Sequence, residues 1–372
     1  MENLGISISM AVLLLIFHMT TLTSSVASRR EFIPESKLGQ CNFYDGEWVY
    51  DKSLPLYDSS KCSLLIPKEF DCLKNGRPDR EFLKYRWQPK DCYLPQFDGV
   101  DFLGRIKGKK MLFVGDSLSE NQWGSLTCLL KSAIGERSQI IQSRIDNTST
   151  VTFQEYNSSV NYFSSQYLVD IENTTSGRTL NLDSIKDGEI WRQYDVLIFN
   201  TWHWWYRSKG PKELWDVIKD DGKIVQDMNR MDAFRKALTT WANWVSSISV
   251  KPTTKVLFQG ISPSHYNGKD WNTPGVTCEK EMTPLKGSIY PSGEPLESKV
   301  LKEVLNTKIS SKKPVHLLDI TLLSQLRKDG HPTKYNKYGS DCTHWCIPGV
   351  VDTWNHLLYT HIVQEGDRQG TK

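Results

Sequence analysis

Four short apolar runs, each followed by polar residues, dominate the hydrophobic pattern of this chain. They span residues 111–114, 196–199, 256–258 and 315–318. Short runs that are apolar at every position are typical of strands buried on both faces, as the strands of a parallel sheet are. The pattern therefore predicts a mainly parallel sheet that contains these four strands.

Helical periodicity separates the runs. Apolar residues recur at helical spacing after Ser117, and a second helix between residues 199 and 256 has one apolar face. That face carries Met231, Phe234, Leu238, Trp241, Ala242 and Val245. Pro348 and Gly349 open a last helix. Strands that alternate with helices predict an α/β fold, a three-layer sandwich around the mainly parallel sheet.

The region before residue 99 has a different character. Between Cys41 and Asp98 there are four cysteines, several aromatic residues and few periodic apolar runs. We interpret residues 29–98 as a disulfide-stapled, loop-rich N-terminal segment that packs on the core, and residues 99–372 as the core domain.

Residues 1–28 are expected to direct the chain into the secretory pathway. The apolar run from Ile6 to Phe17 is shorter than the roughly 20 residues of a membrane span. Small residues from Ser25 to Ser28 offer a cleavage site, although no Lys or Arg precedes the run. We expect a cleaved signal peptide. An uncleaved Golgi anchor is the alternative, and only that anchor would contact a membrane.

Cysteines and glycosylation sequons agree with this compartment. An even number of cysteines, eight, predicts disulfides, and the residues alone leave their connectivity open. Sequons at Asn147, Asn157 and Asn173 predict glycosylation in one solvent-facing region. The expected location is the Golgi lumen or the cell wall.

Charge and metal-ligand spacing narrow the class of partner. The 46 basic and 43 acidic residues give a net charge of only +3, so no overall field points to nucleic acid. No cluster of His, Cys and Asp has metal-ligand spacing. We predict no metal and no tightly bound cofactor.

Ser117 is the candidate nucleophile. It follows the first apolar run at the turn Gly115-Asp116-Ser117 and precedes a helix. Ligands of open parallel sheets bind beyond the carboxyl ends of the strands, where this serine would lie. Backbone N–H groups and the dipole at the helix N-terminus would stabilise an oxyanion there.

A serine nucleophile needs a base, and the base needs an orienting partner. Asp341 and His344 are separated by two residues, so the carboxylate can fold back and hold Nδ1–H while Nε2 faces the serine. Cys342 and Cys346 bracket the histidine and would fix its loop. His265 is the alternative base, although no carboxylate accompanies it at close spacing.

The segments around these residues resemble the plant trichome birefringence-like family. One signature is Val114-Gly115-Asp116-Ser117-Leu118 with Asn121-Gln122-Trp123 behind it, and the other is Asp341-Cys342-Thr343-His344-Trp345-Cys346-Ile347-Pro348-Gly349. The likeness extends over nearly the whole chain from Cys41. Further matching segments are Gly46-Glu47-Trp48-Val49, Asn75-Gly76-Arg77-Pro78-Asp79 and Ser262-Pro263-Ser264-His265.

The resemblance implies a GDSL/SGNH-hydrolase-like catalytic domain that O-acetylates xylan, mannan, xyloglucan or pectin in the Golgi. Ser117 would form an acetyl-enzyme, with His344 as base and then acid, and Asp341 as its orienting partner. The reaction partners would be a polysaccharide acceptor and an acetyl donor, either acetyl-CoA or another acetylated carrier. The resemblance also implies the bridges Cys41–Cys92, Cys62–Cys128, Cys72–Cys346 and Cys278–Cys342.

Five further residues are candidates for oxyanion or substrate contacts. Gly115 precedes the nucleophile, and Asn200 stands where the resemblance places an asparagine oxyanion donor. His203 and Trp204 belong to an aromatic run after a strand, whose rings either stack on sugars or pack in the core. His265 follows another strand. The chain departs from the family at Glu120, where many members have a basic residue, and at Trp202, where they have glycine.

Two other functions fit the same residues. An acetylesterase would use the same three groups, because water or a sugar hydroxyl can resolve one acetyl-enzyme. A non-catalytic protein that binds wall glycans would keep the fold and its aromatic residues. The intact set of Ser117, Asp341 and His344 favours an enzyme.

Overall fold

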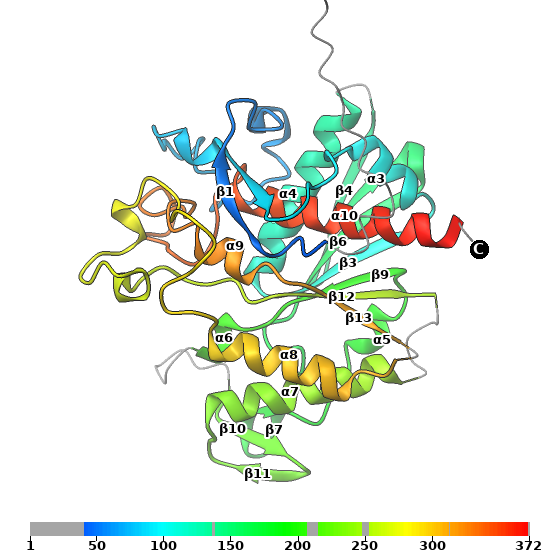
Figure 1. Ribbon diagram of the computed structural model, residues 1–372. Coiled ribbons are helices and arrows are strands. Elements are labelled where there is room, and N and C mark those ends of the chain that lie inside the picture. Colours follow the sequence, from blue (N-terminus) through cyan, green and yellow to red (C-terminus); the bar gives the residue numbers. More distant parts are fainter. Residues whose placement is uncertain (1–40, 136–137, 207–214, 248–252, 312, 371–372) are drawn as a thin grey trace, which may run out of the picture. The chain divides into compact units, whose positions relative to one another are not determined.

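The computed structural model describes residues 41–135, 138–206, 215–247, 253–311 and 313–370. The predicted signal segment, residues 1–28, lies outside the described residues. From Cys41 onward the chain forms one unit, whose secondary structure is shown in Figure 1.

Seven strands form the main sheet, in the order β13-β12-β9-β3-β6-β5-β4. Their bounds are β3 Lys110–Gly115, β4 Ile140–Ile145, β5 Thr148–Phe153, β6 Ser158–Ser164, β9 Val196–Phe199, β12 Lys255–Gln259 and β13 Val315–Leu318. The four strands predicted from apolar runs are β3, β9, β12 and β13. They are neighbours in the sheet and pair in parallel.

The other edge of the sheet makes it mixed. β6 pairs in parallel with β3, but β5 and β4 continue the sheet in antiparallel pairing. The apolar pattern predicted none of these three strands. β4 explains why, because most of its side chains face solvent and its sequence, IIQSRI, includes polar residues.

Helices cover both faces of the main sheet, with α3, α4 and α10 on one side and α7 and α8 on the other (Figure 1). Leu112 and Val114 of β3 share a buried cluster with Phe234 and Trp241 of α7 and Val300 of α8. The helix bounds are α3 Gly99–Arg105, α4 Ser117–Ile134, α5 Gly188–Trp191, α6 His203–Tyr206, α7 Arg230–Ser246, α8 Leu296–Lys308, α9 Thr321–Gln325 and α10 Val350–Gly370. The predicted helices are α4, α7 and α10.

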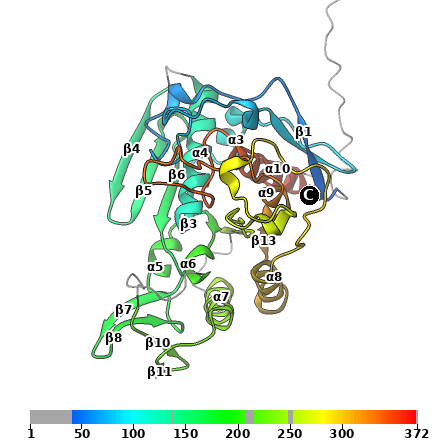
Figure 2. The same cartoon turned by 90° about the vertical axis from the view of Figure 1, so that its left-hand side faces the viewer.

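A second, four-stranded sheet lies away from the main one, next to α7 (Figure 2). Its order is β11-β10-β8-β7, with bounds β7 Asp170–Thr174, β8 Gly177–Asn181, β10 Val217–Asp220 and β11 Lys223–Val225. Short, amphipathic strands of this kind carry a weak apolar signal, and the sequence did not predict them.

The N-terminal part of the described chain holds one antiparallel pair of strands, β1 Gly46–Tyr50 and β2 Tyr85–Pro89, and is otherwise made of loops and short helical turns. Four disulfides are present, and they are the pairs that the resemblance implies: Cys41–Cys92, Cys62–Cys128, Cys72–Cys346 and Cys278–Cys342. Two of them attach this part of the chain to α4 and to the segment before α10.

The three sequons are exposed but do not share one region. Asn147 directly precedes β5 and Asn157 directly precedes β6, whereas Asn173 lies in β7 of the second sheet. The expectation of a single glycosylated face was therefore wrong, because neighbours in the sequence here belong to different strands. None of the helices in the described ranges combines the length and hydrophobicity that a membrane crossing requires.

Candidate active site

Ser117 begins α4, directly beyond the carboxyl end of β3. Asp116 precedes it as the helix N-cap, and its Oδ1 accepts a hydrogen bond of 3.0 Å from the Leu118 N–H. A side chain at Gly115 would lie 2.4 Å from the carbonyl oxygen of Asn200 and 2.4 Å from Ser119 Oγ. Only glycine fits this approach, so Gly115 shapes the turn that presents the serine.

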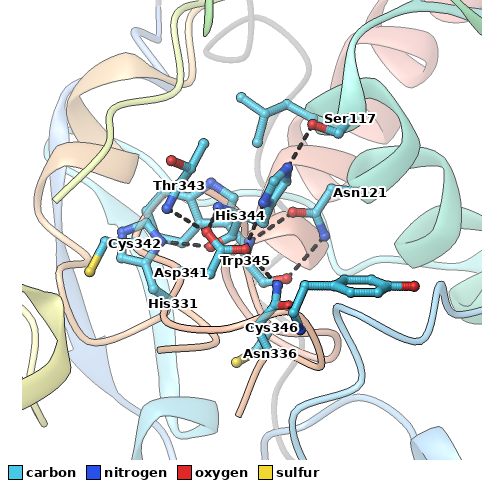
Figure 3. Close-up of polar contacts among 12 residues, drawn as sticks. Ser117, Asn121, His331, Asn336, Asp341, Cys342, Thr343, His344, Trp345 and Cys346 are labelled. Atoms are coloured by element: carbon cyan, nitrogen blue, oxygen red, sulfur yellow. Dashed lines mark hydrogen bonds and ion pairs between the residues drawn. The ribbon is translucent and has the colours of Figure 1, made fainter. Parts of the chain in front are cut away.

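Ser117, His344 and Asp341 form one chain of hydrogen bonds (Figure 3). Ser117 Oγ lies 2.6 Å from His344 Nε2, and His344 Nδ1 lies 2.7 Å from Asp341 Oδ2. Because the carboxylate only accepts, Nδ1 carries the hydrogen and Nε2 is free to accept from the serine hydroxyl. The geometry is that of a nucleophile, a base and an orienting carboxylate.

The carboxylate of Asp341 is held in its ionised form. Burial by itself would raise its pKa, but the hydrogen bond and charge of His344 outweigh this effect, together with the backbone N–H groups of His344 and Thr343. The net result holds the pKa of Asp341 well below its ordinary value. Asp341 is therefore available as a negative partner when His344 takes a proton.

Comparisons with known proteins show what this chain is similar to. The family profile described as "GDSL/SGNH-like Acyl-Esterase family found in Pmr5 and Cas1p" matches residues 94–361, and one described as "PMR5 N terminal Domain" matches residues 39–93. Protein trichome birefringence-like 38 of Arabidopsis thaliana is 52% identical over 321 residues, which cover 86% of this chain and 83% of that protein. Protein trichome birefringence-like 39 of the same plant is 47% identical and covers 91% of each chain.

The chain belongs to the trichome birefringence-like family. In this family member, Asn121 joins the helix of the serine to the loop of the histidine. Its Oδ1 accepts from the Trp345 N–H at 2.8 Å, and its Nδ2 donates to the Trp345 carbonyl oxygen at 3.0 Å (Figure 3). Asn121 lies four residues after Ser117 on one face of α4, so this pair of bonds fixes the approach of His344 to Ser117.

Other contacts hold the histidine loop of this trichome birefringence-like protein from several sides. Two disulfides, at Cys342 and Cys346, flank His344. His331 Nδ1 donates to the His344 carbonyl oxygen at 2.6 Å, and the ring of Phe70 stacks on the imidazole with centroids 5.1 Å apart. A base held on so many sides is pre-organised for proton transfer.

The three groups open into a cleft of about 480 Å³. Its lining is polar and aromatic, and it consists of Glu69, Phe70, Ser117, His203, Trp204, Tyr206, Ser264, Tyr266, Asn336, Tyr338, Gly339, Ser340, Asp341, Thr343 and His344. The described residues contain no group of three or more His, Cys, Asp or Glu side chains that could hold a metal ion.

Two of the predicted substrate residues, His203 and Trp204, line the cleft. His203 Nε2 donates to the Ser262 carbonyl oxygen at 2.9 Å, because a carbonyl can only accept. Burial lowers the pKa of His203, against the opposing charge of Asp116, so the neutral ring is favoured. Two other residues of the aromatic run, Trp202 and Trp205, do not line the cleft but pack against Phe234 in the core.

Asn200 and His265, two further predicted contacts, do not line the cleft. Asn200 is 1% exposed, does not line the cleft, and donates from Nδ2 to Asp116 Oδ1 at 2.6 Å. His265 is fully buried, with Nδ1 2.6 Å from His331 Nε2 and Nε2 2.9 Å from the Gln325 carbonyl oxygen. The predictions that Asn200 donates to the oxyanion and that His265 contacts substrate are therefore not met by this geometry. Both residues support the turn or loop behind the site.

Sequence reasoning missed the supporting residues of the site. Asn121 had a local signal, its spacing of four from Ser117 on a predicted helix. Phe70, His331 and Asn336 had none, because they lie in loops whose positions depend on the rest of the fold.

Proposed function

We propose that this protein transfers acetyl groups to hydroxyls of a plant cell-wall polysaccharide through an acetyl ester of Ser117. The observation that carries the proposal is the hydrogen-bonded chain of Ser117, His344 and Asp341 inside a polar, aromatic cleft. Membership of a GDSL/SGNH-like acyl-esterase family supports acyl chemistry at this serine. Helices on both faces of the sheet support the assignment of an SGNH-like three-layer sandwich.

The proposed reaction has two halves. In the first, His344 Nε2 takes the proton of Ser117 as Oγ attacks the acetyl carbonyl of the donor, and the protonated ring then gives this proton to the leaving group. In the second, His344 takes a proton from a sugar hydroxyl, whose oxygen attacks the acetyl-serine. The ester moves to the sugar, and Ser117 recovers its proton from His344. Asp341 stabilises the imidazolium in each half.

The backbone N–H of Ser117 is our candidate oxyanion donor. It lies at the N-terminus of an 18-residue helix, where the helix dipole favours negative charge. Asn200 contributes indirectly, because its bond to Asp116 holds the N-cap that places this turn. The site therefore relies on the backbone for oxyanion stabilisation.

Replacing the nucleophile tests the proposal. Purified Ser117→Ala protein should lose acetyl transfer to de-acetylated xylan or pectin, and after incubation with an acetyl donor its intact mass should lack the one acetyl group that the wild type gains. Ser176→Ala is the control, since Ser176 is an exposed serine between β7 and β8 and does not line the cleft. Equal acetylation by wild type and Ser117→Ala would overturn the proposal.

Hydrolysis of acetylated wall polysaccharide is the second candidate function. His344 is 23% exposed and Ser117 is partly exposed, so water can reach an acetyl-serine. Acetate release from acetylated polymer, with no transfer to de-acetylated polymer from any donor, would select the esterase. Transfer in the same assay selects the transferase.

We propose that the protein works in the lumen of the secretory pathway, in the Golgi or after secretion to the wall. Four disulfides support an oxidising compartment. The exposed sequons Asn147, Asn157 and Asn173 are accessible to a glycosylating enzyme there.

A further inference from the structure

Three tyrosines with strongly exposed side chains line the cleft around Ser117. Tyr206 is 75% exposed, Tyr266 50% and Tyr338 77%. They belong to α6, to the segment after β12 and to the loop before Asp341, so that folding alone gathers them. Large aromatic side chains that stay exposed around one cleft are typical of a binding surface.

Sugars are the ligand class that this lining suits. An aromatic ring presents an apolar face, on which the C–H face of a pyranose can stack, while its hydroxyl stays in water. Ser264, Ser340 and Thr343 line the same cleft with groups that can bond to sugar hydroxyls.

The loop of Tyr338 is bonded to the reactive groups. Asn336 Oδ1 accepts from the Tyr338 N–H at 2.8 Å. Asn336 Nδ2 donates to Asp341 Oδ2 at 2.7 Å (Figure 3). The same carboxylate oxygen receives the His344 Nδ1–H. Asn336 therefore acts as a positioning residue that fixes the exposed tyrosine relative to the base. Lys337 Nζ lies 5.7 Å from the Tyr338 ring centroid, so a positive charge lies beside this exposed ring.

We propose that Tyr338, Tyr206 and Tyr266 form a glycan subsite beside Ser117, where the sugar rings next to the acetylated one stack. The inference rests on the proposed function and names the residues that determine its specificity for a polymer. A small acetyl ester reaches Ser117 without this subsite. A glycan chain depends on it.

The test compares a small ester with glycans. Wild type, Tyr338→Ala and Tyr206→Ala are assayed with p-nitrophenyl acetate and, in separate arms, with acetylated xylohexaose and acetylated galacturonan hexamer. Tyr93→Ala is the matched control, because Tyr93 is 58% exposed but lines a separate pocket beside β1 and β2. We expect KM on at least one glycan to rise about tenfold in the two cleft variants, since stacking on an aromatic ring is lost. Rates on p-nitrophenyl acetate should stay unchanged.

The glycan on which KM rises identifies the class of ligand that the subsite binds. A rise confined to xylohexaose supports a neutral glycan, and one confined to the galacturonan hexamer supports an acidic glycan held with Lys337. An unchanged KM on both glycans in both cleft variants would overturn the inference, whatever the control shows.

A binding measurement separates this inference from the proposed function. If p-nitrophenyl acetate turnover is the same in wild type and Ser117→Ala, the proposed function fails. The subsite is then tested by calorimetric titration of Ser117→Ala with the de-acetylated hexamers. A Kd that rises about tenfold on adding Tyr338→Ala supports the subsite, and an unchanged Kd or undetectable binding before this change contradicts it.

Discussion

Asn121 shows at the scale of one residue how the site is held together. Both polar ends of its side-chain amide bond to the backbone of Trp345, the neighbour of His344. Ser117 and His344 lie 227 residues apart in the chain, so neither has a local reason to stay within hydrogen-bond distance of the other. Asn121 lies on the same helix as Ser117, and its two hydrogen bonds hold the histidine loop next to that helix.

Asn121→Ala should therefore lower kcat on p-nitrophenyl acetate by about 10- to 100-fold with little change in KM, because misplacing a catalytic group by about 1 Å costs this much. Asn355→Ala is the control. Asn355 is also buried and its Nδ2 donates two hydrogen bonds, to the Gln122 carbonyl oxygen and to Ser125 Oγ, neither of which belongs to the histidine loop. Both variants should lose about 1–3 kcal/mol in urea denaturation. An equal loss of kcat in the two variants would contradict a positioning role for Asn121.

At the scale of elements, Asp352 joins three parts of the chain at the start of α10. Its Oδ1 accepts from Ser125 of α4 at 2.6 Å and from Tyr57 of the N-terminal part at 3.0 Å, and its Oδ2 accepts from the Gly349 N–H. Burial raises the pKa of Asp352 to about 6, although these hydrogen bonds partly oppose the shift. The ionised carboxylate is thus stabilised less in the folded protein than in the unfolded chain.

This shift predicts a pH dependence of stability. Between about pH 4, where an unfolded aspartate ionises, and about pH 6, the folded protein binds more protons than the unfolded chain. The free energy of unfolding that Asp352 contributes therefore falls as the pH rises through this range and is constant above it. Asp352→Asn should lack this fall. Urea denaturation of both proteins across the range checks it, and parallel curves would contradict the assigned pKa.

At the scale of the whole molecule, the N-terminal part and the core share one interior. The Trp48 Nε1–H donates to the Leu323 carbonyl oxygen at 2.8 Å, and Arg77 donates to the His331 carbonyl oxygen at 2.9 Å. In the other direction, Arg327 donates to the Phe82 carbonyl oxygen at 2.6 Å. These bonds are buried, so removing one partner leaves polar groups without water or hydrogen bonds.

We expect a chain that begins at residue 94, where the acyl-esterase profile begins, to fail to fold. It would lose Phe70, which stacks on His344, and the partners of two core cysteines, Cys128 and Cys346. Near-ultraviolet circular dichroism and p-nitrophenyl acetate turnover measure the outcome. The control is the full chain with Cys41→Ser and Cys92→Ser, which should fold with a loss of about 2–5 kcal/mol. A folded, active fragment would contradict the shared interior.

The sequence by itself predicted the elements that have a strong local signal. The strands β3, β9, β12 and β13 are apolar at nearly every position, and α7 has a continuous apolar face. The mixed edge, β4 and β5, and the whole second sheet went unpredicted because their strands are short and bury few side chains. A short segment with few buried apolar residues does not differ in its sequence pattern from a loop.

Sequence alone also determined the candidate reactive groups, because a serine at a strand-to-helix turn and a closely spaced Asp and His have chemical meaning wherever they lie. Only the tertiary structure decided which side chains join them. It turned Asn200 and His265 into buried supports, it joined Asn121 to the histidine loop, and it brought Asn336 and three tyrosines to the cleft. The physical reason is that periodicity and turn chemistry act over a few residues, whereas convergence on one cleft depends on the packing of segments hundreds of residues apart.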